Sequence, residues 1–440
     1  MPRRRALLAA LVVLGVGAPA AWADPPWTVP AVVPGAFSAP GGVVFTAAGH
    51  GLIAGPALDS LAEHPTLVTP LDAAGRMGTG RPVAIFAGRL VTYGADGLAL
   101  IGTRAAQTSA QADAAPVLVA TGKGATGAFG TPRALPGTAG QQVLAVAGSA
   151  RGTIALVTGT GSGPRERIVW AGAGGATLRR VLTIHVGTQA RGASVAVGSH
   201  GDLLVAYEDA HTIFSRHVGP TGHTAAAHKL GAGVQSELQT RYDDSGRQEV
   251  AWMRQRVDEG DAVTGATVSY TSAAKGHNFT KARIVGRDDI TGAGRYVQLP
   301  GVRLVGSGSD SSVLATTIYT GGHYRVEVAG LAGGTVQPAS VMPTGDGDVV
   351  LGDLAYSRAG GTEVLWLSDT RGTDPTGPQQ VFGDVRPAGA ATFGPAEAIS
   401  AAGVPYPPQA AVDPVSGTAA AVYGTVAGQA LESVRPVAAP

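Results

Sequence analysis

The chain has 440 residues, a formal net charge of +1 and no cysteine. Only 14% of its residues are charged, which argues against nucleic acid as a partner because phosphate binding needs a basic surface. Without cysteines it has no disulfide framework and no lipid-modified cysteine. Stability must come from packing, and a chain of this length can bury a large core.

Residues 1–23 predict a signal peptide. Arg3–Arg5 are positive, Ala6–Pro19 are apolar, and Ala21–Ala23 have the small-x-small pattern of a signal-peptidase site. The apolar run is about fourteen residues, whereas a membrane-spanning helix needs about twenty. We therefore expect no membrane span and a secreted, extracytoplasmic protein cleaved before Asp24. The Arg4-Arg5 pair leaves both Sec and Tat export open.

A short phrase recurs along the rest of the chain: a glycine, then small and β-branched residues, with an aromatic residue six positions on. Its clearest copies are Gly201–Tyr207, Gly246–Trp252, Gly360–Trp366 and Gly417–Tyr423. The 66 glycines and 29 prolines stand between short apolar runs, and no run shows helical periodicity. The sequence therefore predicts an all-β fold.

Each repeat divides into about four strands, and repeats of this kind at intervals of about fifty residues are typical of a β-propeller. One copy has strands at 193–197, 203–208, 212–218 and 224–230. Copies are expected to begin near Val43, Arg89, Val143, Ala193, Leu238, Val302, Val349 and Gln409. We predict a single propeller domain over 24–440 with about eight blades, seven being the alternative. The phrase's aromatic residues would be packing wedges between blades.

The two ends of the chain are expected to share the last blade. The last repeat has three strands and lacks a fourth, whereas Trp27–Pro30 stands alone before the first repeat. It is similar to segments interpreted as fourth strands elsewhere, namely Phe129–Pro132, Phe279–Ala282 and Phe393–Ala396. Residues 24–35 would then be the closing strand of the last blade, with Trp27 and Val29 buried, and would cover an otherwise open edge.

One segment stands out as a candidate ligand site. Residues 253–261 concentrate charge in a chain that has little of it, in a long turn between the second and third strands of one blade. Long loops on one face of a propeller are often functional, although a solvated hairpin tip fits equally well. The ligand-binding candidates are Arg254, Arg256, Asp258, Glu259 and Asp261.

Metal and nucleophile signals are weak. Asp346 and Asp348, separated by a glycine, supply two of the several oxygen ligands that calcium needs, and solvated turn residues are the alternative. Calcium is the only cofactor that the sequence suggests. The ten histidines are scattered, and His217, His223 and His228 have no metal-ligand spacing. No nucleophile elbow is present.

Two family comparisons follow from these motifs. Asp243–Gly246 is similar in letters to the Asp box of sialidase-like propellers, but it precedes a second strand and lacks the threonine and tryptophan, so sialidase activity is not supported. The recurring phrase resembles that of secreted, repeat-rich β-propeller proteins of actinobacteria. Such proteins generally have no assigned activity, so the resemblance implies a fold and no functional residue.

Two function classes remain open. We favour a monomeric, non-catalytic binding or interaction scaffold whose ligand is an unknown protein or glycan, because no catalytic constellation stands out. The alternative is an extracellular carbohydrate-active enzyme, a glycoside hydrolase or polysaccharide lyase, that uses carboxylates from different blades at the central channel. The sequence leaves enzymatic activity uncertain, because residues on separate blades have no fixed spacing.

The signal peptide gives a first testable prediction. Protein recovered outside the cytoplasm should begin at Asp24, because the apolar segment and the small-x-small site direct cleavage there. N-terminal sequencing of the exported protein checks this, and an exported protein that still carries Met1 would contradict it.

Overall fold

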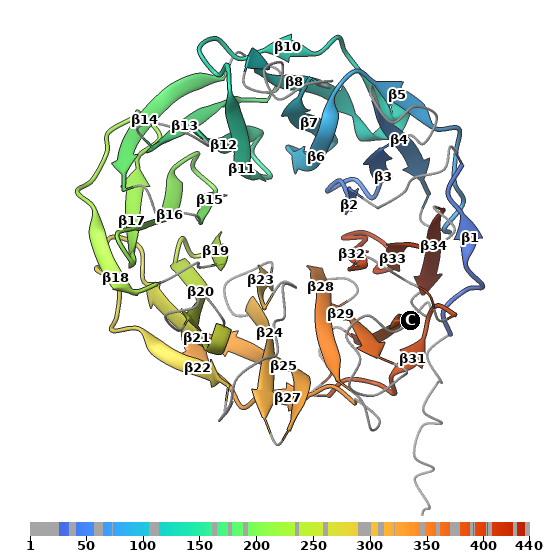
Figure 1. Ribbon diagram of the computed structural model, residues 1–440. Helices are drawn as coiled ribbons and strands as arrows, with labels where there is room; N and C mark the ends of the chain where they lie inside the picture. Colours follow the sequence, from blue (N-terminus) through green and yellow to red (C-terminus); the bar gives the residue numbers. More distant parts are fainter. Residues whose placement is uncertain are drawn as a thin grey trace, which may run out of the picture.

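The computed structural model describes residues 26–34, 41–56, 65–72, 74–104, 114–160, 165–174, 178–187, 192–233, 237–257, 263–288, 301–306, 312–320, 322–343, 348–357, 361–369, 379–387, 390, 392–401, 403, 407–425 and 429–435. Their strands form eight antiparallel sheets arranged in a ring (Figure 1). No helix within these ranges has the length and apolar character to cross a membrane.

The first four sheets, blades 1 to 4, follow one another along the chain. Blade 1 has β2 (Gly42–Phe45), β3 (Gly51–Pro56), β4 (Thr66–Leu71) and β5 (Arg81–Val83). Blade 2 has β6 (Phe86–Tyr93), β7 (Gly97–Thr103), β8 (Val117–Lys123), the short 3-10 helix η1 (Gly124–Thr126), β9 (Ala128–Phe129) and β10 (Arg133–Ala134). Blade 3 has β11 (Gln141–Gly148), β12 (Thr153–Thr160), β13 (Arg165–Ala173) and β14 (Arg179–Val186). Blade 4 has β15 (Ala193–Val197), β16 (Leu203–Asp209), β17 (Thr212–Val218) and β18 (His228–Ala232).

Blades 5 to 8 complete the ring. Blade 5 has β19 (Glu237–Tyr242), β20 (Gln248–Val257), β21 (Val263–Ala273) and β22 (Arg283–Arg287). Blade 6 has β23 (Val302–Gly306), β24 (Ser312–Thr320), β25 (His323–Ala332), β26 (Thr335–Val336) and β27 (Ser340–Val341). Blade 7 has β28 (Val349–Ser357), β29 (Gly361–Asp369), β30 (Gln379–Arg386) and β31 (Glu397–Ala398). Blade 8 has β32 (Gln409–Val412), β33 (Ala419–Gly424), β34 (Ala430–Arg435) and β1 (Ala31–Val32).

The structure is therefore an eight-bladed β-propeller, which confirms the predicted fold and rules out seven blades. The first strands of all eight sheets contact one another in sequence around the axis, and β32 contacts β2 to complete the circle. Because the strands within a blade run up and down in order, the turns between strands 1 and 2 and between strands 3 and 4 lie on one face of the ring. We call it the turn face. The turns between strands 2 and 3 and the links between blades lie on the other, the connection face.

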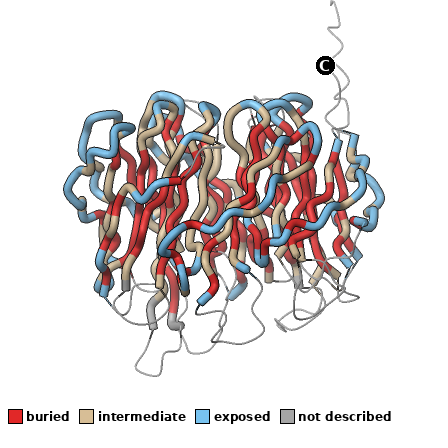
Figure 2. Tube along the Cα trace, turned by 90° about the horizontal axis from the view of Figure 1, so that it is seen from above, coloured by how far each residue is buried: buried red, intermediate tan, exposed pale blue. Residues whose placement is uncertain are grey.

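The core consists of apolar clusters between neighbouring blades (Figure 2). Second strands are buried almost throughout, because neighbouring sheets cover both of their faces. The phrase's aromatic side chains, Tyr207, Trp252, Trp366 and Tyr423, are all buried, which agrees with their predicted role as wedges. The phrase's glycine has a local reason too, since Gly201 turns the chain into β16 with a φ of 84°.

The predicted fourth strands are displaced along the chain. Phe279–Ala282 and Phe393–Ala396 are extended segments without a ladder, and the paired strands β22 and β31 begin directly after them. In both segments the aromatic ring packs onto a cluster between blades, so the side chain anchors the chain before pairing starts. Phe129 ends the short strand β9, and β10 follows Pro132.

The ring closes through the N-terminal segment, as predicted. In β1, Ala31 pairs with Glu432 and Val32 with Leu431 of β34. Thr28 extends the contact, since its N–H donates to the Val434 carbonyl at 2.8 Å and its carbonyl accepts from Ser433 Oγ at 2.7 Å. Segments some four hundred residues apart thus form one sheet (Figure 1).

The prediction for Val29 was wrong. Val29 is 88% exposed, whereas Val33 is fully buried in the cluster between blades 8 and 1. Val29 lies before the paired residues Ala31–Val32, whereas Val33 directly follows them. The Val33 N–H donates to the Ala430 carbonyl at 3.0 Å, which places this residue against the cluster. Trp27 is partly buried against the cluster between blades 7 and 8.

Closure gives a stability prediction with a matched control. Deleting residues 24–34 should lower the melting temperature markedly or cause aggregation, because it removes the pairing with β34 and the buried Val33. Val33→Ala should cost about 2 kcal/mol of unfolding free energy, whereas Val29→Ala should cost almost nothing. Thermal and urea unfolding of the three variants check this. A deletion that unfolds like the parent would show that the strand does not hold the ring closed.

Candidate functional site

The described part of the charged segment, residues 253–257, ends β20 on the connection face of blade 5. Asp258, Glu259 and Asp261 are outside the described residues. Arg254 and Arg256 belong to β20, where their backbones pair with Thr267 and Gly265 of β21. The Arg254 side chain is half-buried and lines neither of the cavities below. These five residues stay a prediction.

The structure describes one of the two weak calcium candidates. Asp346 lies outside the described residues, and the Asp348 carboxylate accepts from the backbone N–H of Tyr324 at 2.9 Å and lies 3.5 Å from His323 Nδ1. Within the described part of the chain, no three His, Asp or Glu side chains are grouped closely enough to hold a metal ion. Asp348 thus contacts the first residues of β25, and the calcium site stays a prediction.

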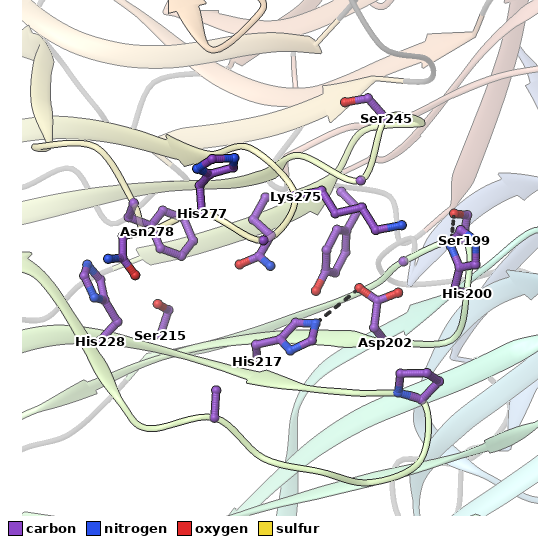
Figure 3. Close-up of a pocket in the computed structure, with 18 of the residues that line it drawn as sticks. Ser199, His200, Asp202, Ser215, His217, His228, Ser245, Lys275, His277 and Asn278 are labelled. Atoms are coloured by element: carbon purple, nitrogen blue, oxygen red, sulfur yellow. Dashed lines mark hydrogen bonds and ion pairs between the residues drawn. The ribbon is translucent and has the colours of Figure 1, made fainter.

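A cavity of about 780 Å³ opens on the turn face between blades 4 and 5. We call it the blade 4–5 pocket (Figure 3). Four turns surround it: those between β15 and β16, β17 and β18, β19 and β20, and β21 and β22. Its floor is the apolar cluster between the two blades, onto which Tyr242 and Phe279 pack while they also line the cavity.

Backbone hydrogen bonds hold these turns in place. Gly198 donates to the Asp202 carbonyl at 2.8 Å, Gly219 to the His223 carbonyl at 2.7 Å and Asp243 to the Arg247 carbonyl at 3.0 Å. Gly198 is needed for a close approach, because a Cβ there would lie 2.5 Å from Asp202 Oδ1. The walls of the pocket are thus largely preformed.

The blade 4 wall carries an Asp–His contact. Asp202 Oδ2 lies 3.5 Å from His217 Nε2, and Asp202 also interacts with the Tyr242 hydroxyl, although that pair falls short of hydrogen-bond geometry. The contact with His217 is the main cause of a lowered pKa for Asp202. Burial, with the nearby Asp202 charge, raises the pKa of Tyr242. Asp202 is thus held as a carboxylate and Tyr242 as a neutral phenol.

The blade 5 wall carries cationic and amide groups. Lys275, His277 and Asn278 project from the turn between β21 and β22, opposite His217 (Figure 3). The lysine stem passes over Gly246, where a Cβ would lie 3.2 Å from Lys275 Cδ. Nearby, the Phe279 and His228 rings stack across the two blades with centroids 5.8 Å apart. The pocket therefore combines hydrogen-bonding groups with a flat ring surface.

A second, smaller cavity of about 210 Å³ lies among the first strands of blades 3 to 6. Glu237 and Arg303 line it; Glu237 accepts from the Gly301 N–H at 2.8 Å, and Arg303 Nε donates to Asp353 at 3.1 Å. Burial is the main cause of a raised pKa for Glu237. Glu237 is thus engaged by backbone and Asp353 by Arg303.

Comparisons with known proteins assign no family and no function to this chain. No family model matches the chain, and no curated protein does. An ulvan lyase described as a new family of polysaccharide lyase is 10% identical over 78% of this chain and 92% of its own, with a TM-score of 0.45. A protein from Lactobacillus plantarum is 14% identical over 79% and 95%, with a TM-score of 0.46. A fungal alcohol oxidase in complex with copper is 11% identical over 94% and 77%, with a TM-score of 0.45. Similarity at this level identifies neither a ligand nor an activity.

Sequence reasoning missed the blade 4–5 pocket. Four of the ten histidines line it, and they appear scattered because four separate turns supply them and their partners. A usable signal was present. His200, His217 and His277 all lie in or beside turn-face turns of two consecutive repeats, and aligning turn positions between repeats would have grouped them.

Several carboxyl groups are too deeply buried to reach a ligand. Glu363 and Asp384 of blade 7 are fully buried, and Glu432 of β34 is 2% exposed. Burial raises the pKa of Glu363 well above its ordinary value and that of Asp384 to about 7. It also raises the pKa of Glu432 to about 7, helped by Asp72. These groups belong to the seams of the last blade and act on stability.

The raised pKa values of these buried carboxyl groups predict that the stability of the fold decreases as the pH rises. From about pH 4 to about pH 7 the unfolded chain ionises these carboxyls while the folded chain keeps Asp384 and Glu432 protonated, so folding becomes less favourable over that window. The shifts correspond to about 3 to 4 kcal/mol for each group. Urea unfolding at pH 4.5 and 7.5 should show the loss, and it should shrink in an Asp384→Asn, Glu432→Gln double variant. The same pH dependence in that variant would contradict the assignment.

Proposed function

We propose that this propeller is a non-catalytic binding protein that acts outside the cytoplasm and holds a glycan in the blade 4–5 pocket. The observation that carries the proposal is the combination of the stacked Phe279 and His228 rings with polar side chains on both walls. Sugar rings present apolar faces that pack on flat side chains and hydroxyls that need hydrogen-bond partners.

The polar partners suit hydroxyl groups. Asn278 and Gln248 each offer an amide donor and acceptor, and Ser215 on the blade 4 wall offers a hydroxyl. Asn278 lies in the turn between β21 and β22, Gln248 begins β20 and Ser215 belongs to β17, so a ligand of two or three sugar units could contact both blades. Extracytoplasmic location is supported by the N-terminal sequence, whose residues 1–25 lie outside the described ranges.

One observation favours a second candidate, an extracellular glycoside hydrolase or polysaccharide lyase. His217 faces the pocket beside Asp202 and Tyr242, which is a set of groups able to accept and return a proton. Binding alone is the function we favour, because Asp202, the carboxylate of this set, is already engaged by His217 and Tyr242.

The test measures retention and product release together. Purified protein is passed over an immobilised panel of neutral and acidic polysaccharides, and soluble panels are assayed for new reducing ends and for unsaturated products. We expect retention without product. An Asn278→Ala, Gln248→Ala double variant should bind about tenfold more weakly, because each lost hydrogen bond is worth about 0.5–1.5 kcal/mol.

Gln337→Ala is the matched control, since it removes an exposed amide from blade 6, away from the pocket. It should bind like the parent. Failure to retain any member of the panel would contradict glycan binding. Equal binding by the double variant would place the site elsewhere, and product that disappears in His217→Asn would establish the enzymatic alternative.

A further inference from the structure

We infer that the glycan held in the blade 4–5 pocket is acidic, carrying carboxylate or sulfate groups, and that it is bound more tightly as the pH falls from about 7.5 to 5.5. The inference rests on the proposed glycan binding and specifies its ligand. It starts from the charges of the pocket rather than from its shape.

The fixed charges that line the pocket are few. They are one lysine, Lys275, and two aspartates, Asp202 and Asp244. Both carboxylates already interact with groups of the protein, Asp202 with His217 and Tyr242. Lys275 is exposed and forms no ion pair with any described residue. The negative charges are thus used internally, whereas the lysine charge is available to a ligand.

Protonation of the titratable groups changes the net charge of the pocket lining. The turn between β15 and β16 contributes His200, β17 contributes His217, β18 contributes His228, and the turn between β21 and β22 contributes His277. Tyr242 of β19 completes the set and stays neutral, since its pKa is raised. Histidine is the side chain whose charge ordinarily changes between about pH 5 and 8. With all four imidazoles neutral, the lining carries −1, and with all four protonated it carries +3.

The four histidines do not contribute equally. Protonated His217 would be compensated by Asp202, 3.5 Å away, so its charge stays within the protein. His277 and His228 have no carboxylate partner among the described residues, and His200 Nδ1 contacts the Ser199 hydroxyl at 3.0 Å. Positive charge gained on these three is available to an anion.

The geometry places the anionic group. Lys275 and His277 lie two residues apart in one turn, which the His277 N–H closes by donating to the Ala274 carbonyl at 2.9 Å. Both project from the blade 5 wall, opposite the Asp202–His217 contact (Figure 3). A carboxylate or sulfate at Lys275 meets a cation that forms no ion pair with a described residue, and His277 and the Phe279–His228 stack line the same pocket.

The experiment uses the whole mature protein and paired polymers. Pectate, alginate, chondroitin sulfate and dextran sulfate are each compared with their carboxyl-reduced or desulfated forms, at pH 5.5 and 7.5 and at one ionic strength. We expect at least one acidic polymer to bind about tenfold or more tightly at pH 5.5 than at pH 7.5. Its neutral form should bind more weakly, and with little pH dependence.

Matched variants separate the pocket from the rest of the surface. Lys275→Met should weaken binding of the acidic polymer at both pH values. His277→Asn should reduce the ratio of the affinity at pH 5.5 to the affinity at pH 7.5. Lys281→Met removes an exposed lysine of the same blade outside the pocket, and His211→Asn an exposed histidine on the connection face of blade 4; both should bind like the parent. All four should melt like the parent, because all four side chains are exposed.

The outcomes distinguish the two proposals. Equal binding of acidic and neutral forms, or binding independent of pH, would overturn the acidic ligand while leaving glycan binding in place. If Lys281→Met weakened binding of the acidic polymer as much as Lys275→Met does, the attraction would be to the surface in general. That result would also overturn the acidic ligand. No binding to any polymer would contradict both.

Discussion

The constraint on which this molecule depends is that every sheet is covered on both faces by its neighbours. A blade has no solvent-facing side on which to alternate polar residues, so its second strand is apolar almost throughout, as in β16 and β33. A single blade cannot cover both faces of its own sheet, so the ring of blades must close. Closure falls to β1, whose pairing with β34 joins the two ends of the chain.

The same constraint decides where recognition can occur. Side chains on the faces of the sheets are committed to packing, and polar ones that remain there are enclosed. The Arg241–Glu249 pair, 2.7 Å apart, is held with Tyr270 and Ser312 between blades 5 and 6, out of reach of any ligand. Groups free to bind must come from the ends of strands and from turns. The blade 4–5 pocket is built in that way, with packed aromatic side chains as its floor and turns as its walls.

Within the pocket, electrostatics divide the two walls. Asp202 is held on the blade 4 wall by His217 and Tyr242, and the close approach of Gly198 leaves it little room to turn. The blade 5 wall presents Lys275 and His277 on an exposed turn. A site whose carboxylates are engaged within the protein while its lysine charge is free discriminates by ligand charge and not only by shape.

The sequence by itself determined the fold. In its four clearest copies an apolar strand, introduced by a glycine and ended by an aromatic residue, reports burial on both faces. That is a local property, so about eight blades could be predicted, with seven as the alternative, and the closing strand inferred from a missing partner. What only the tertiary structure decided were the details that depend on register and on neighbours. The closing segment buries Val33, which directly follows the residues paired with β34, and leaves Val29, which precedes them, exposed. The pocket joins Asp202 and Lys275 from turns and His217 from the end of β17, in two blades. Loops of variable length leave no fixed spacing between such residues for a sequence pattern to show.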